Sequence, residues 1–343
     1  MDCIRHIESH PRRFVAPVVT LGNFDGVHRG HQAILERVVA AARARGDEAV
    51  AISFHPHPLA VLKPERAPGV LTPLREKVRW IAATGVDVLV LRHFTRAFAS
   101  LEPETFVERF LVDRLHASRL VVGHSVSFGR NRRGDATLLT ELGRRHGFDL
   151  EVVGPVRADG HEVSSSLVRR SITEGNLRLA TALLGRPHAL IGRVVVGKQR
   201  GAALGFPTAN VAVRAGLHPP DGVYAVRVEI SPAHGRPASE TIRRDGVANI
   251  GRNPTFGENA RTLEAHIFDF DTDIYGRRCR VAFVERVRGE IKFPGVEALV
   301  AQIARDADDA RGILAREPRD PSNGGPADGG PANGGPPNAD PSA

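Results

Sequence analysis

The chain has few cysteines, tyrosines, tryptophans and lysines, and it has no long apolar run. Cys3 and Cys279 are the two cysteines among 343 residues. Two cysteines cannot build the disulfide framework of a small secreted protein, so they favour a reducing compartment. The N-terminal segment MDCIRHIESHPRRF carries charges throughout, unlike a signal peptide, and no apolar run approaches the roughly 20 residues that a membrane-spanning helix needs. We therefore expect a cytoplasmic protein without a membrane partner.

The excess of basic residues is not gathered into one block. Lysine and arginine number 47 against 39 acidic residues, which gives a net charge of +8, and only four of the 47 are lysines. A strongly basic chain attracts phosphate and can bind nucleic acid. Here the arginines are scattered among acidic residues, so we do not expect nucleic-acid binding as the main role. An arginine-rich RNA-binding or scaffolding protein is the alternative from a different class.

The first half of the chain alternates short apolar runs with helical patterns. The stretch HQAILERVVAAARARG carries one apolar stripe at helical spacing, which predicts a helix. The apolar runs follow one another at intervals of roughly 30 to 37 residues, which is typical of βαβ units in a parallel sheet. These runs are Val18–Leu21, Ala49–Phe54, Val86–Leu91, Leu120–Val122 and Leu150–Val153. The pattern predicts an α/β domain of the Rossmann-like, nucleotide-binding type.

The second half has short apolar runs separated by turns rich in glycine and proline. This rhythm predicts a small antiparallel β-barrel, and the pattern over Gly295–Arg316 predicts a C-terminal helix. The expected strands include Arg193–Val196, Tyr224–Ile230, Leu263–Phe268 and Arg280–Val284. We expect one domain over residues 1–184 and a second over 185–316. Residues 317–343 have no large apolar side chain to bury, so we expect a disordered tail rich in glycine and proline.

The segment VVTLGNFDGVHRGHQAIL places a strand, a glycine-bearing loop and a helix start in succession. Small residues let the backbone approach a phosphate, and the free amides of a helix start attract anions. His28 and His31 are three residues apart and can point at the same phosphate group. One hydrogen-bond donor to the charge that develops on such a phosphate in the transition state is typically worth about 100- to 1,000-fold in rate. Metal binding or an ordinary helix cap is the alternative for two histidines in isolation.

The string GNFDGVHRGH resembles the HxGH signature of the nucleotidyltransferase superfamily, in the form used by bacterial bifunctional riboflavin kinase/FMN adenylyltransferases, the prokaryotic FAD synthetases. The likeness continues through SFHPHP and VSSSLVRRSITEGN. It implies that His28 and His31 are catalytic and that further residues bind ATP, with an arginine fork suited to phosphate. These residues are Gly22, Phe24, Asp25, Gly26, Ser164, Ser165, Ser166 and Arg169. A serine that caps a helix is the alternative for the serine run, and it is compatible with phosphate binding.

The element Gly123–Gly129 departs from the family pattern. Ser125 stands where the family has Asn or Asp, and Val126 stands where it has Phe. The resemblance implies that Ser125, Phe128 and Asp135 bind the flavin. Because the two replacements fall in this element, a riboflavin kinase with a degenerate adenylyltransferase domain is the alternative function.

In the second half, GRVVVGKQRGAALGFPTANV resembles the flap and the PTAN motif of riboflavin kinases. The resemblance implies that Gly197, Arg200, Thr208 and Asn210 bind ATP. Thr208 and Asn210 would also hold Mg²⁺, because hydroxyl and amide oxygens suit a hard cation. Ala202 stands where this flap usually has a basic residue. A Pro-Thr-Ala-Asn string in isolation would be a common turn, and the absence of GxxxxGK[ST] excludes an ordinary P-loop kinase.

The string TLEAHIFDFDTDIYG completes the resemblance to the kinase. Strand alternation places Glu264, His266 and Phe268 on one face, opposite an apolar face. The resemblance makes Glu264 the general base that takes the proton of the ribityl 5′-hydroxyl, a role that typically contributes about 100- to 10,000-fold. A solvent-facing glutamate paired with an arginine is the alternative. We expect His266 to be structural and not catalytic.

The segment VANIGRNPTFG, Val247–Gly257, resembles a loop near the flavin, where Asn253 and Phe256 would bind it. The whole resemblance implies FAD synthesis: riboflavin is phosphorylated by ATP to FMN, and FMN is adenylylated by a second ATP to FAD with release of pyrophosphate. Riboflavin, FMN and ATP are then the partners, and Mg²⁺ is expected at both sites. We expect a monomer or a weak homo-oligomer.

Overall fold

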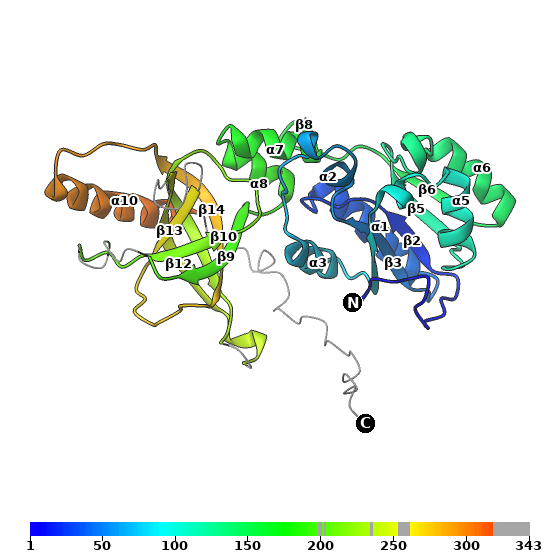
Figure 1. Ribbon diagram of the computed structural model, residues 1–343, viewed down its shortest axis with the longest axis horizontal. Helices are drawn as coiled ribbons and strands as arrows, with labels where there is room; N and C mark the ends of the chain where they lie inside the picture. Colours follow the sequence, from blue (N-terminus) through cyan, green and yellow to red (C-terminus); the bar gives the residue numbers. More distant parts are fainter. Residues whose placement is uncertain (198–200, 202–203, 234–235, 253–260, 318–343) are drawn as a thin grey trace, which may run out of the picture.

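The computed structural model of the chain describes residues 1–197, 201, 204–233, 236–252 and 261–317. These residues form a parallel sheet with its helices, followed by an antiparallel barrel with a long C-terminal helix (Figure 1). The expected fold class is confirmed. The expected tail, apart from Glu317, lies outside the described residues.

All strand pairs of the N-terminal sheet are parallel. The strand order is β1(Asp2–Ile4), β4(Val88–His93), β3(Ala49–His55), β2(Val18–Leu21), β5(Arg119–Gly123) and β6(Asp149–Val153). From β2 the chain builds outward first through β3 and β4, and later returns to place β5 on the other side. Ligands of such sheets bind at the carboxyl ends of the strands beside this change of direction. The loop that follows β2 therefore occupies the expected position of a site.

Each of the five apolar runs of the first half forms a strand. The runs are apolar without alternation because a parallel sheet covered on both faces buries both sides of its strands, and all four residues of β2 are buried. The three-residue β1 was too short to be expected. The helices between the strands include α1(Arg29–Arg43), α3(Leu74–Ala83) and α6(Ala136–His146), with shorter turns α2(Pro58–Leu62), α4(Arg96–Ala99) and α5(Pro103–Phe106).

Two helices join the sheet to the barrel. A hairpin of β7(Arg157–Ala158) and β8(His161–Glu162) leads into α7(Ser165–Thr173) and α8(Leu177–Leu184), which lie between the two bodies (Figure 1). Leu177 packs into the barrel core, whereas Leu184 packs beside α7. The helix α8 ends at Gly185, whose φ of 75° is the left-handed conformation that favours glycine at a helix end.

The barrel closes on itself through antiparallel pairs. Its order is β10(Ala209–Val213), β13(Arg261–Ile267), β12(Ile242–Arg252), β11(Gly222–Ile230), β14(Arg278–Arg288) and β9(Ala189–Val195), and β9 returns to β10. Leu263, Ala265 and Ile267 of β13 point into the core, as the alternation predicts. The C-terminal helix α10(Val296–Arg316) covers the outer side of β11, β12 and β14.

The structure corrects one expectation in the barrel. Residues Val247–Arg252 were expected in a loop, but they form the second half of β12. Its sequence, IRRDGVANIGR, mixes charged residues and glycines with the apolar positions, which hides the strand pattern. Residues Asn253–Gly257 of the same segment lie outside the described residues.

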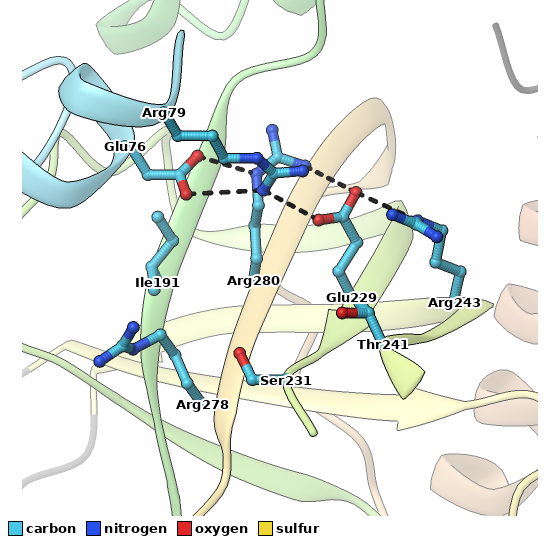
Figure 2. Close-up of a pocket in the computed structure, with 9 residues that line it drawn as sticks. All are labelled: Glu76, Arg79, Ile191, Glu229, Ser231, Thr241, Arg243, Arg278 and Arg280. Carbon is cyan, nitrogen blue, oxygen red and sulfur yellow. Dashed lines mark hydrogen bonds and ion pairs between the residues drawn. The ribbon is translucent and has the colours of Figure 1, made fainter. Parts of the chain in front are cut away.

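A cluster of charged side chains joins α3 of the sheet domain to the barrel wall (Figure 2). Arg280 Nε on β14 donates to Glu76 Oε2 at 3.2 Å, and Arg79 Nη1 donates to Glu229 Oε2 of β11 at 3.1 Å. All four side chains are at most 14% exposed. Such alternating pairs fix one orientation of the two surfaces, because any other orientation would leave buried charges without partners.

We expect Asp306→Ala to lower the free energy of unfolding by about 3 kcal/mol, because it removes one partner of a buried ion pair. Asp306 is 3% exposed and accepts hydrogen bonds from Gln302 of the same helix and from Arg288, which ties α10 to β14. Chemical denaturation measures the effect. Asp308→Ala, at an exposed position of the same helix, is the matched control; equal losses in the two variants would contradict the prediction.

Candidate functional site

The loop between β2 and α1 has an unusual backbone. Phe24, Gly26 and Val27 have φ values of 48°, 89° and 39°. A β-branched residue such as Val27 rarely adopts positive φ, and such strain persists only where neighbouring groups hold the backbone in place. Strained segments of this kind are concentrated at ligand-binding sites.

The two histidines of the motif lie side by side at the start of α1. Their rings stack with centroids 3.6 Å apart and an angle of 14° between the planes. His28 is the N-cap, and its Nδ1 accepts a hydrogen bond from the His31 N–H at 3.3 Å. The Phe24 ring stands edge-on against His31 at 5.3 Å. The sequence placed the two imidazoles at one location, and the structure brings them into contact there.

Both imidazoles are neutral at pH 7. Burial lowers the pKa of His28 to about 4 and lowers the pKa of His31 well below its usual value, and the positive charge of Arg169 acts in the same direction. Because Nδ1 of His28 accepts a hydrogen bond, the proton of the neutral ring is on Nε2. His28 can therefore donate a hydrogen bond from Nε2 to an anion without becoming charged.

Asp25 connects this loop to two other segments. Its carboxylate is 6% exposed and accepts hydrogen bonds from the amides of Leu71 and Thr72. It also accepts one from Arg169 Nη2 at 2.5 Å, while Arg169 Nε donates to the carbonyl of Gly69. Asp25 thus fixes the position of the Arg169 guanidinium.

The other residues expected at ATP are the serines at the start of α7, which lie at the site, and Phe24 and Gly22, which pack in the core. Ser165 Oγ donates to the Asp25 carbonyl at 3.0 Å, which places it against the loop. Ser164 caps α7 by accepting from the Leu167 N–H. Ser166 is exposed on the same helix start. The Phe24 ring is buried in the core, and Gly22 packs against it, so neither offers a side chain to a ligand.

The residues expected at the flavin have mainly structural contacts. Phe128 is buried and packs against Phe106 with centroids 5.7 Å apart, and Val126 packs against the same core. Asp135 caps α6 by accepting from the Leu138 N–H at 2.9 Å. Ser125 is exposed at the turn after β5.

Lys77 is a residue of this site that sequence reasoning missed. Its buried ammonium donates to the carbonyls of Asn23 at 2.8 Å and Phe54 at 3.2 Å. It thus holds the loop after β2 against the end of β3 at the carboxyl edge of the sheet. Burial lowers its pKa. The rarity of lysine in this chain was the only signal that could have pointed to it.

The residues that the resemblance implies for the kinase reaction gather on the outer face of the barrel. Glu264 of β13 lies directly opposite Asn210 of β10 on one side and Asn249 of β12 on the other. Opposite residues of paired strands share a face and have Cβ atoms about 5 Å apart. The structure therefore brings Glu264 and Asn210 together as expected, and it adds Asn249, which the sequence did not single out.

Two glycines bring the preceding segment close to these polar groups. A Cβ on Gly197 would lie 2.2 Å from Asn210 Nδ2, and a Cβ on Gly201 would lie 3.2 Å from Thr208 Oγ1. Only glycine permits this approach. The oxygens of Thr208 and Asn210 fit the donor set of a hard cation. Arg200, Asn253 and Phe256 lie outside the described residues.

His266 supports the neighbouring PTAN segment. Its Nδ1 lies 2.8 Å from the carbonyl of Pro207, which can only accept, so Nδ1 carries the proton. Its ring also stands edge-on against Phe206 and Phe268, with centroids 5.5 and 5.9 Å away. The hydrogen bond holds Pro207, which precedes Thr208, and the ring contact holds Phe206 next to it.

Comparisons with known proteins divide the chain in the same way. A family model described as FAD synthetase matches residues 11–167, and one described as riboflavin kinase matches residues 184–314. The chain is 41% identical over 294 residues to the bifunctional riboflavin kinase/FMN adenylyltransferase of Escherichia coli (strain K12), covering 86% of this chain and 91% of the relative. A protein of the same name from Pseudomonas fluorescens is 40% identical over 299 residues, with 87% and 93% covered.

One similar crystal structure has a different description. It is called a macrolide-efflux protein from Streptococcus pneumoniae, and it matches with a TM-score of 0.80 and 31% identity over 91% of this chain and 99% of that chain. In the part of the present chain that the structure describes, no helix has the length and apolar character to cross a membrane.

We expect His28 to stay neutral when the pH falls from 8 to 5. Because its pKa of about 4 is below the value of about 6.5 expected in an unfolded chain, the unfolded state binds more protons between these two values. The contribution of His28 to the free energy of unfolding is thus full above pH 6.5 and decreases as the pH falls toward 4. NMR titration of the imidazole, assigned with His28→Gln, measures the pKa. A midpoint near 6.5 would contradict the prediction.

Proposed function

Because the chain belongs to the family of bifunctional riboflavin kinase/FMN adenylyltransferases, we propose that each of its two domains carries one of the two active sites described above. The enzyme phosphorylates riboflavin with ATP to FMN and then joins FMN to the adenylyl group of ATP, giving FAD and pyrophosphate. The observation that supports the assignment is the separation of the two residue groups. The stacked histidines lie in the sheet domain, and Glu264 lies with Asn210 on the barrel.

In the barrel, Glu264 is the general base of the kinase reaction. It accepts the proton of the ribityl 5′-hydroxyl while that oxygen bonds to the γ-phosphorus of ATP and the bond to the β-phosphate oxygen breaks, leaving ADP. Asn210 and Asn249 lie opposite Glu264 on the two neighbouring strands, which supports a role of their amides in orienting the carboxylate. His266 acts as a support for the PTAN segment through the hydrogen bond from its Nδ1 to the Pro207 carbonyl. Positioning dominates such phosphoryl transfers.

Thr208 and Asn210 would hold Mg²⁺ at this site. The hydroxyl and amide oxygens match its preference for oxygen ligands, and the glycines at 197 and 201 let the preceding segment approach these two side chains closely. When bound, Mg²⁺ neutralises charge on the phosphates. The protein side chains supply the remaining requirements, which are the orientation of the hydroxyl and a base to take its proton.

In the sheet domain, the FMN phosphate is the nucleophile, and its oxygen attacks the α-phosphorus of ATP as pyrophosphate leaves. FMN phosphate is already anionic at neutral pH, so no protein base is needed. His28 donates from Nε2 to the α-phosphate oxygen on which charge increases. Arg169, fixed by the Asp25 carboxylate, and Ser165, which donates to the Asp25 carbonyl, bind the triphosphate.

Flavin binding to Ser125, Phe128 and Asp135 is part of this proposal. Phe128 and Asp135 would act by shaping the pocket, because their side chains are already engaged in packing and capping. Val126 replaces an aromatic residue of the family pattern without leaving the core. No observation favours a kinase with an inactive adenylyltransferase domain.

We place the domain boundary between residues 184 and 185, where α8 ends, and the second boundary between 316 and 317. The free thiols of Cys3 and Cys279 support a cytoplasmic location. We further propose that the protein is a monomer or a weak homo-oligomer and that it acts on small molecules and not on nucleic acid.

Glu264→Gln should reduce FMN formation from riboflavin by about 100-fold or more while leaving the conversion of FMN to FAD within twofold of the parent. The amide keeps the shape of the side chain but cannot take a proton. Purified protein is incubated with ATP, Mg²⁺ and either flavin, and the products are separated by chromatography. Equal loss of both reactions would show that the variant disturbs the whole protein, and an unchanged kinase would remove Glu264 from the mechanism.

His28→Ala combined with His31→Ala should have the reverse effect. FAD formation from FMN is expected to fall at least 100-fold, because donors at the α-phosphate are lost, whereas riboflavin phosphorylation continues and FMN accumulates. His161→Ala, at an exposed position outside the site, is the matched control. Retained FAD synthesis in the double variant would exclude the histidines from adenylyl transfer.

A further inference from the structure

A buried arginine from the segment between the domains holds the backbone of the loop that carries His28. Arg186 follows the end of α8 and is 5% exposed. Its Nη2 donates to the Gly26 carbonyl at 2.6 Å, and its Nη1 donates to the carbonyls of Val27 and Leu184, both at 3.1 Å. One guanidinium therefore binds two consecutive carbonyls of the strained loop and the end of the helix from which it comes.

The surroundings of Arg186 fix the plane of its guanidinium. The guanidinium lies over the Trp80 ring at 4.1 Å, and Trp80 Nε1 donates to Glu76 at 3.2 Å. Glu76 in turn pairs with Arg280 of the barrel (Figure 2). Burial lowers the pKa of Arg186 to about 9, so the side chain is still protonated at neutral pH. A stacked, planar cation has little freedom to move, which makes it a rigid support for the groups it binds.

The loop is where such a support is required. Gly26 and Val27 both have positive φ, and for Val27 this conformation is strained. A peptide unit is planar, with its C=O and N–H pointing in opposite directions. Holding the Val27 carbonyl therefore sets the direction of the His28 N–H and the position from which the His28 ring projects. Gln32 Nε2 donates to the same two carbonyls of Val27 and Leu184, at 2.7 and 2.9 Å. Each of these carbonyls therefore accepts hydrogen bonds from two side chains.

We propose that Arg186 is a positioning residue for adenylyl transfer, which fixes the left-handed Gly26–Val27 turn and thereby places His28 at the α-phosphate. The inference rests on the proposed role of His28. Arg186 itself need not touch a substrate, because both of its terminal nitrogens already donate to backbone carbonyls. Lysine cannot replace it, since a single ammonium lacks the planar fork that spans Gly26, Val27 and Leu184 and stacks on Trp80.

The test measures both reactions of the full-length Arg186→Lys variant with FMN, riboflavin, ATP and Mg²⁺. We expect kcat for FAD formation to fall at least tenfold with the KM for FMN within threefold, while riboflavin phosphorylation stays within twofold. Arg186→Ala should show a larger loss of FAD formation that added guanidinium chloride at low millimolar concentration partly restores. Parent-like FAD formation by Arg186→Lys, or equal losses in both reactions, would overturn the proposal.

Arg114→Lys is the matched control, because Arg114 also donates to backbone carbonyls of the sheet domain, those of Ile7 and His10, away from the loop. A general loss of stability would affect this variant in the same way, whereas the proposal predicts that its FAD formation is unchanged. Equal loss in the control would contradict a specific role for Arg186.

A second measurement separates this proposal from that for His28. The NMR resonances of the His28 imidazole should shift in Arg186→Lys and remain unchanged in Arg114→Lys. If His28→Ala retains FAD synthesis but the resonances still shift, the role of His28 fails while the positioning contact stands. If the resonances do not move, the positioning role of Arg186 is wrong whatever His28 does.

Discussion

The turn between β2 and α1 depends on hydrogen bonds that come from distant parts of the chain. Its left-handed backbone is not favourable for Val27, and the compensating donors are Arg186, Gln32 and Lys77. A helix start alone attracts anions weakly. The fixed turn adds two neutral imidazoles at that start and an arginine held by Asp25, so that the donors are arranged before a substrate arrives. Such preorganisation is the main source of electrostatic catalysis.

The proposed kinase site obtains its order from a different source, the register of three antiparallel strands. Strand pairing sets Glu264 between Asn210 and Asn249, and no long-range side-chain contact is needed to place them. The alternation that sends Leu263 and Ala265 into the core sends Glu264 to the outer face. A shift of β13 by one residue would bury the carboxylate and expose the core, so the stability of the barrel itself protects the site.

The sequence was sufficient for the features that depend on local pattern. The parallel strands, α1, the C-terminal helix and the alternation around Glu264 follow from spacing, and the motif GNFDGVHRGH located the paired imidazoles. Other features depend on contacts that spacing does not encode. Arg186 binds carbonyls about 160 positions earlier in the chain, and Lys77 joins the loop after β2 to the end of β3, which only the sheet brings together. Asn249 was hidden because β12 carries charges and glycines, and the capping role of Asp135 emerged only with α6.

The two halves differ in how exposed their backbones are to other molecules. The closed barrel pairs every one of its described strands on both sides, whereas the sheet ends at β1 and β6. β1 is only three residues long, and β6 carries Asp149 and Glu151, with Glu151 paired to Arg37. Short or charged outer strands resist the addition of a strand from a second molecule. An enzyme with a long central sheet thus limits intermolecular β-pairing, and with it aggregation during synthesis at high concentration.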